Sequence, residues 1–220
     1  MTFSKEWDNR YKENTNMSIW PWSDLIGYVK RYVRLSKNSR VLELGCGAGA
    51  NIPFFLSLGV KYYSIEGSAT MVNKLKKKFP NLQENIVVGD FTQNIPFSKS
   101  FDLVIDRSSL THNTTKGIIE CLDNVNQKLK VRGKYIGIDW FSTSHSSYKK
   151  GGKMVDAFTR NRFQKGQFQN VGNVHFSDKA HLQDLFKSFE FLVLEHKIIK
   201  KELLSDEEIL ASWNFVAQKS

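Results

Sequence analysis

The chain has 220 residues, a formal net charge of +10 and 40% hydrophobic residues. This length favours one domain, and the apolar fraction excludes an intrinsically disordered chain. No run approaches the roughly 20 apolar residues that span a membrane, and the N-terminus lacks an apolar secretory run, so we expect neither membrane insertion nor secretion. Cys46 and Cys121 cannot form a disulfide framework, which favours a cytoplasmic protein.

The charge is carried by 24 Lys and 8 Arg. Lys is a usual residue of hydrated surfaces, whereas Arg supplies the planar fork that reads phosphates and bases. We therefore expect a Lys-rich solvated surface, with nucleic acid as an alternative partner. A monomer or a homodimer is expected.

The predicted elements alternate between helix and strand in chain order. A first helix is expected over 22–33, where Leu25, Ile26 and Val29 begin one apolar face. Strands are expected at 40–44, 62–66, 85–88, 101–105, 134–141, 191–194 and 211–217. Further helices are expected at 54–58, 71–79, 118–129 and 182–186. This alternation predicts an α/β fold with a parallel sheet that is covered on both faces.

Two segments lie outside this alternation. Residues 1–22 are polar and aromatic, and we expect an N-terminal arm or lid. Residues 142–178 are rich in Gly, Lys, Asn, Gln and Phe, and this length is unusual for a structureless loop. We expect an inserted substrate cap there, within a single domain of residues 1–220.

A glycine-rich turn follows the first predicted strand. Gly45, Gly47 and Gly49 leave the backbone free to turn tightly and to approach a ligand closely. Glu66 ends the next strand, a position that suits a carboxylate accepting hydrogen bonds from a ribose diol. The turn can also be written as the G-x-G-x-x-A dinucleotide fingerprint, but Glu43 stands where that fold has an apolar strand residue.

With these residues the sequence resembles the class I S-adenosylmethionine-dependent methyltransferases. The resemblance rests on Val41-Leu42-Glu43-Leu44-Gly45-Cys46-Gly47-Ala48-Gly49, Glu66, Gly89-Asp90-Phe91 and Phe101-Asp102-Leu103-Val104-Ile105-Asp106. It covers about residues 38–142 well, and it departs from the family at Val131 and Arg132. It implies a doubly wound, mostly parallel seven-stranded sheet of the Rossmann-like methyltransferase type, with the last strand antiparallel. The implied cofactor is S-adenosyl-L-methionine, with S-adenosyl-L-homocysteine as product.

The resemblance also implies the residues that bind this cofactor. The glycines would pass beneath its methionine and ribose parts, Glu66 would hold the ribose hydroxyls, and Asp90 and Phe91 would bound the adenine. The full set of expected cofactor contacts is Glu43, Gly45, Cys46, Gly47, Gly49, Glu66, Gly67, Ser68, Asp90, Phe91, Asp106 and Arg107.

Methyl transfer from a sulfonium needs orientation and exclusion of water, and it needs a base only when the nucleophile must lose a proton. His112 is a candidate base because imidazole titrates near working pH. Asp106 is a second candidate catalytic residue. The expected substrate contacts are Trp20, Asp139, His145 and Arg160. No His, Cys or carboxylate cluster has metal spacing, so no metal is expected.

These features predict a methyltransferase that acts on an O or N atom of a small molecule, sugar-like or anionic, by in-line displacement. Asp106-Arg107-Ser108-Ser109 replaces the family's amino-methylating motif, which disfavours a nucleobase acceptor. RNA methylation is kept as an alternative. An NAD-dependent oxidoreductase is the alternative from another class of enzyme.

Overall fold

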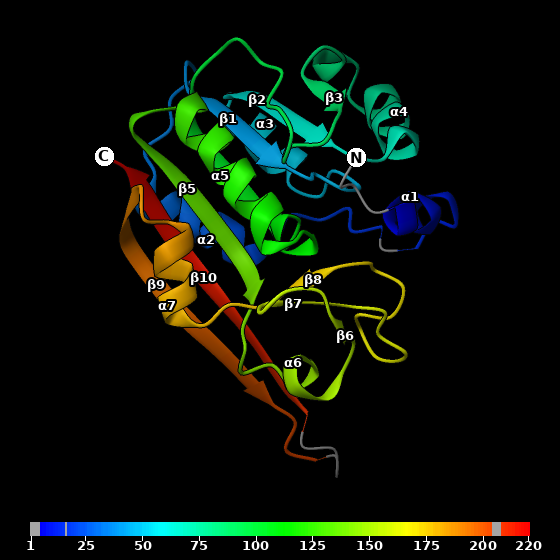
Figure 1. The fold of residues 1–220 in the computed structure, drawn as a ribbon. Helices are drawn as coiled ribbons and strands as arrows, with labels where there is room; N and C mark the ends of the chain where they lie inside the picture. Colours follow the sequence, from blue (N-terminus) through cyan, green and yellow to red (C-terminus); the bar gives the residue numbers. More distant parts are fainter. Residues whose placement is uncertain (1–4, 16, 204–207) are drawn as a thin grey trace.

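The computed structural model of the chain describes residues 5–15, 17–203 and 208–220 (Figure 1). Its centre is a seven-stranded sheet with the order β3-β2-β1-β4-β5-β10-β9. The strands of this sheet are β1 (Arg40–Leu44), β2 (Lys61–Glu66), β3 (Ile86–Val88), β4 (Phe101–Arg107), β5 (Leu129–Phe141), β9 (Phe189–Lys200) and β10 (Ile209–Lys219). Strands β1 to β5 pair in parallel, whereas β10 runs antiparallel to both β5 and β9. The predicted doubly wound sheet with an antiparallel last strand is confirmed.

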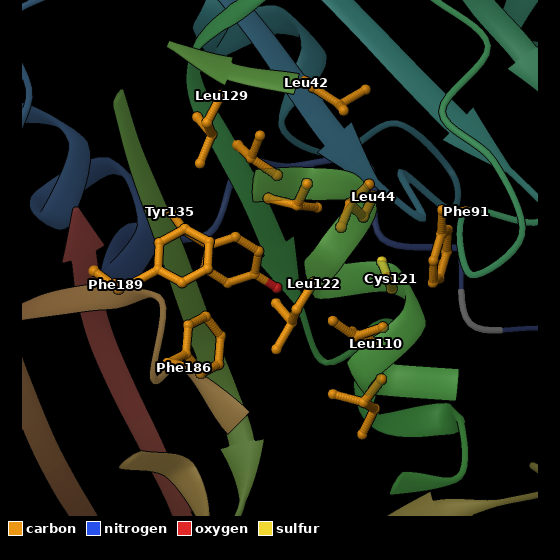
Figure 2. Packing of buried hydrophobic residues seen from close by; sticks show 14 of the residues in the cluster. Leu42, Leu44, Phe91, Leu110, Cys121, Leu122, Leu129, Tyr135, Phe186 and Phe189 are labelled. Carbon is orange, nitrogen blue, oxygen red and sulfur yellow. The ribbon is translucent and has the colours of Figure 1, made fainter. Parts of the chain in front are cut away.

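Alternate residues of the central strands face two hydrophobic cores. On one face, α2 (Ser23–Tyr32), α3 (Ile52–Ser57) and α4 (Ala69–Lys78) pack over Val41 and Leu103. On the other, α5 (Thr115–Lys128) and α7 (Lys179–Leu185) pack over Leu42 and Val104. Figure 2 shows part of this second core, with Leu122 of α5 beside Tyr135 and Phe186. Burial on both faces explains why the strands are almost continuously apolar.

The remaining elements lie around the carboxyl ends of the parallel strands (Figure 1). Helix α1 (Lys5–Lys12) packs against α4. Beyond β5 the chain forms α6 (Ser146–Lys150) and a small antiparallel sheet of β6 (Lys153–Met154), β7 (Thr159–Asn161) and β8 (Val174–His175). We call residues 142–178 the cap. Its own small core contains Phe163, Phe168 and Phe176.

Several element boundaries differ from the sequence predictions. Strand β5 begins at Leu129 instead of 134, β9 extends well beyond 191–194, and β10 extends two residues beyond 211–217 at each end. Strand β9 lies at the edge of the sheet, and its polar residues find partners there: Tyr28 donates to Glu195, and Lys197 binds Asp24. A strand whose outer half is polar shows no apolar run, which is why the sequence under-predicted its length. Two short 3-10 turns, η1 (Pro80–Leu82) and η2 (Leu110–His112), complete the described elements.

None of the helices within the described ranges is long and apolar enough to cross a membrane.

Candidate active site

A cavity of about 350 Å³ lies at the carboxyl ends of β1, β2 and β4. One wall is the glycine turn after β1, and another is the connection from β4 to η2. Three aromatic side chains of the N-terminal segment complete the lining, namely Trp7, Tyr11 and Trp22. Ligands of open α/β sheets bind at this end of the strands.

The glycine turn requires its glycines for packing as well as for access. Gly45 has φ +67°, and a Cβ there would lie 2.5 Å from Cβ of Ser109. Gly49 has φ +77°, and its Cβ would lie 2.6 Å from a methyl group of Leu75. Gly45 lines the cavity, whereas Gly49 does not. Gly49 thus serves the packing of α4 against the turn.

Glu66, at the end of β2, is buried and lines the cavity. Its Oε2 accepts a hydrogen bond from the backbone N–H of Gly47 at 2.9 Å, and Oε1 accepts one from Ser68 N–H at 2.9 Å. Burial raises the pKa of this carboxyl, while the backbone donors oppose the rise. Each carboxylate oxygen has two lone pairs, so both oxygens keep acceptor capacity for a ligand.

Glu43, on β1, is a second buried carboxyl in the cavity wall. The amide of Asn51 donates to its Oε1 at 2.8 Å, and the hydroxyl of Tyr62 donates to Oε2 at 2.5 Å. Burial raises the pKa of Glu43 to about 7. The sequence predicted Glu43 at the site but not these two partners; the position of Asn51 directly before a helix was the available signal.

Gly89, Asp90 and Phe91 follow β3 and line the same cavity, together with Gly67 and Cys46. Oδ1 of Asp90 accepts from the N–H of Thr92 at 3.0 Å and from its hydroxyl at 2.6 Å. The carboxylate therefore forms the turn after β3 as well as facing the cavity.

Asp106 and Arg107 are neighbours on β4, but they point in different directions. Asp106 is fully buried, and its Oδ1 accepts from the N–H groups of Ser109 at 2.9 Å and Leu110 at 3.0 Å. It does not line the cavity, whereas Arg107 does. The structure therefore places Asp106 as the residue that holds the turn after β4. Ser68 has a similar place outside the cavity, where its hydroxyl caps α4 by accepting from Met71 N–H.

His112 lies in η2 and lines the cavity. Its Nδ1 is 2.9 Å from the carbonyl oxygen of Asn173 in the cap. A carbonyl can only accept, so Nδ1 carries the hydrogen and Nε2 carries the free lone pair. The ring packs edge-on to Trp7 with 5.0 Å between centroids. Burial lowers the pKa of His112 to about 4, so the ring is neutral at physiological pH.

Contacts on both sides of the cavity hold α1 across it. On one side, the hydroxyl of Ser68 donates to Asp8, and Lys74 donates to the carbonyl of Tyr11 at 3.0 Å. On the other, Arg10 donates to backbone carbonyls of residues 169 and 170 in the cap. Helix α1 thus connects α4 to the cap.

The structure does not bring the four expected substrate contacts to this cavity. Trp20 is 78% exposed. His145 caps α6, accepting from Ser147 N–H at 3.1 Å, and Arg160 donates to three carbonyls of its own turn and lies over Tyr148. Asp139 lies behind the wall and pairs with Arg107 at 2.9 Å.

The cavity fits the cofactor that the sequence resemblance implies. Glu66 offers acceptor oxygens for sugar hydroxyls, Phe91 offers an aromatic ring for a base, and the turn at Gly47 presents main chain without a side chain. Within the described ranges, no group of three or more His, Cys, Asp or Glu residues could hold a metal ion.

Comparisons with known proteins agree with this geometry. A family model described as a methyltransferase domain matches residues 41–133. Protein-L-isoaspartate O-methyltransferase of Flavobacterium johnsoniae is 24% identical over 83 residues, which are 36% of this chain and 39% of that protein. The match therefore spans about two fifths of the length of the curated relative.

Solved structures show the same fold over most of the chain. A SAM-dependent methyltransferase of Methanosarcina mazei aligns with a TM-score of 0.69 at 16% identity, covering 91% of this chain and 98% of that one. The N-methyltransferase NodS of Bradyrhizobium japonicum, solved with S-adenosyl-L-homocysteine, aligns with a TM-score of 0.60 at 14% identity, covering 90% and 84% of the two chains. The family model thus identifies residues 41–133 as a methyltransferase domain, and the strand order and the cavity on the glycine turn agree with the fold of S-adenosylmethionine-dependent methyltransferases.

Proposed function

We propose that the chain transfers the methyl group of S-adenosylmethionine to an O or N atom of a small-molecule acceptor by in-line displacement. The observation that carries this proposal is the cavity of about 350 Å³, which combines the glycine turn, Glu66 and the imidazole of His112. Trp7, Tyr11 and Trp22 line it, and a cavity of this volume between bulky side chains favours a small acceptor over a large folded one.

The bound cofactor supplies a methyl group on a sulfonium, which is already a good leaving group. The chain then has to bind, orient and exclude water. We expect Glu66 to accept hydrogen bonds from the ribose hydroxyls, and Asp90 and Phe91 to border the adenine. We expect Glu43 on the methionine side of the glycine turn, where a buried carboxyl suits an ammonium group.

His112 is our candidate for the base. The Nδ1–H bond to the carbonyl of Asn173 fixes the tautomer and the ring orientation, which leaves Nε2 to accept a proton from the acceptor. With a pKa of about 4 the ring is a neutral but weak base. It therefore suits an acceptor whose proton becomes acidic only as the new bond to carbon forms.

The N-terminal segment and the cap have supporting roles in this proposal. Helix α1 is the lid: it places Trp7 and Tyr11 over the cavity, and Arg10 ties it to the cap. The cap holds the proposed base through Asn173. Excluding water in this way strengthens electrostatic interactions at the reacting atoms.

The proposal is tested by ligand binding and then by turnover. S-adenosyl-L-homocysteine should raise the melting temperature of the purified chain, and NADH should leave it unchanged. A panel of small hydroxyl and amine acceptors, incubated with cofactor labelled in the methyl group, should then give a labelled product that Trp7→Ala reduces. Stabilisation by NADH alone, or transfer to RNA but to no small molecule, would contradict the proposal.

A further inference from the structure

Arg107 differs from the other charged residues of the cavity wall. The wall holds the carboxyls of Glu43, Glu66 and Asp90, and among the described residues that line it Arg107 is the only Lys or Arg. It is the last residue of β4, directly before the connection that leads to His112. The cation and the neutral imidazole thus come from β4 and η2, whereas the carboxyls come from β1, from β2 and from the turn after β3.

The guanidinium of Arg107 is rigidly held. Its Cζ lies 3.4 Å from the centroid of the Trp22 ring, and Nη2 donates to Oδ2 of Asp139 at 2.9 Å. Asp139 is itself fixed, since its N–H donates to Asn214 at 2.8 Å and its carbonyl accepts from the hydroxyl of Ser108 at 2.9 Å. A planar guanidinium fixed in this way loses little freedom when it binds a further group.

The backbone next to Arg107 is strained at two residues. Ser108 and Asp139 both have φ +55°, in the left-handed region that residues other than glycine rarely adopt. Such strain persists where the surrounding structure enforces it, and it clusters at functional sites.

Most N–H donors of the Arg107 guanidinium have no hydrogen-bond acceptor among the described residues. A guanidinium has five N–H bonds, and Asp139 is its only hydrogen-bond acceptor among the described residues. The Nε atom is buried and has no partner there. Oδ1 of Asp139 also receives Lys197 at 2.7 Å, so this carboxylate is shared between two cations. A half-buried guanidinium with most of its donors unused is costly unless a ligand supplies acceptors.

We propose that Arg107 binds a carboxylate or phosphate group of the methyl acceptor, so that the acceptor is a small anionic molecule. This inference rests on the proposed function and names its substrate class. The anion would sit at the free edge of the guanidinium, and the nucleophilic O or N would face His112 on the same wall. The sequence resemblance placed Arg107 among the cofactor contacts, and the carboxylate of the cofactor offers the same chemistry as an anionic acceptor. The test separates these two sources.

The test uses the whole chain saturated with S-adenosyl-L-homocysteine and titrated with inorganic phosphate in a calorimeter at constant ionic strength. Wild type should bind phosphate, Arg107→Gln should bind it at least tenfold more weakly, and S-adenosyl-L-homocysteine should bind the variant within threefold of wild type. Arg34→Gln is the matched control, because Arg34 is exposed and outside the cavity, and it should bind phosphate like wild type. If Arg107→Gln does not fold, Arg107→Lys takes its place in the titration. It should bind phosphate at least threefold more weakly than wild type, because lysine lacks the planar fork of N–H donors of the guanidinium.

Two results would overturn the inference. The first is phosphate binding that is absent in wild type or equal in wild type and the Arg107 variants. The second is a tenfold loss of S-adenosyl-L-homocysteine affinity in Arg107→Gln while 5′-methylthioadenosine, which lacks the carboxylate, binds unchanged; this would assign the guanidinium to the cofactor. If wild type fails to bind S-adenosyl-L-homocysteine at all, the proposed function itself fails, and that result is separate from the phosphate titration.

Discussion

Replacing Glu66 by Gln changes one carboxylate oxygen into an amide nitrogen and keeps the shape of the side chain. In the wild type both oxygens accept backbone N–H groups, from Gly47 and Ser68, each at 2.9 Å. The Gln side chain can accept only one of these donors with its carbonyl oxygen. Its NH₂ group would then face either the other backbone N–H, which can only donate, or the ribose hydroxyl of the cofactor, which would lose the carboxylate acceptor for its hydrogen.

The expected loss follows from the bonds involved. A hydrogen bond to a charged group contributes about 1.5–3 kcal/mol, so losing one bond to the ribose should weaken cofactor binding roughly 10- to 150-fold. The stability of the free protein should change less, because Gln also relieves the cost of burying a charge, a cost that shows in the raised pKa of Glu66.

Calorimetric titration with S-adenosyl-L-homocysteine measures this loss, and urea unfolding of the same samples measures stability. Glu84→Gln is a matched control at an exposed site outside the cavity, and it should bind like wild type. If Glu66→Gln binds S-adenosyl-L-homocysteine as tightly as wild type, Glu66 does not hold the ribose and the assignment of this carboxylate is refuted.

Three further predictions concern the base, the glycine turn and the cap. His112→Ala should reduce turnover of an identified acceptor at least a hundredfold with little change in cofactor affinity, and equal losses of both would show that His112 is not the base. The wild-type rate should fall only below about pH 5, as the ring with its pKa of about 4 becomes protonated. Gly45→Ala should lower the free energy of unfolding in urea by about 2–5 kcal/mol, because the backbone there is left-handed and the new Cβ clashes with Ser109. In the control Gly27→Ala no atom lies within 4 Å of the new Cβ, so the free energy of unfolding should stay the same or rise. Burial lowers the pKa of His175 to about 3, so the unfolded chain binds the proton more tightly. Stability should therefore be full above pH 6.5 and fall as the pH drops from 6.5 towards 3, with a shallower fall in His175→Gln; an equally steep fall in the variant would show that other groups cause it.

The fold could be predicted where local pattern and tertiary environment agree. Val41 to Leu44 form a short apolar run because β1 is buried on both faces, and the glycine turn follows because Gly45 must approach Ser109. The cap could not be predicted in the same way. Its strands are two or three residues long, too short for any periodicity, and its core is a cluster of Phe side chains from separate turns.

In the candidate site, too, some residues could be predicted from the sequence and others could not. Residues on the glycine turn and at the ends of β2 and β3 were predicted because their position on the chain sets their position at the sheet edge. The orientation of the Asp106 side chain could not be predicted, because it depends on the N–H groups of Ser109 and Leu110, which hold the carboxylate away from the cavity. The stacking of Arg107 on Trp22 joins residues far apart on the chain, and no local pattern indicates it.

A crystal structure of the chain with S-adenosyl-L-homocysteine tests most directly whether the glycine turn and Glu66 form the cofactor site. The expected result is an adenosyl group above residues 45–49, with both ribose hydroxyls within hydrogen-bond distance of Glu66 and the adenine beside Phe91. A nucleoside bound elsewhere, or a ribose that does not contact Glu66, would contradict the account.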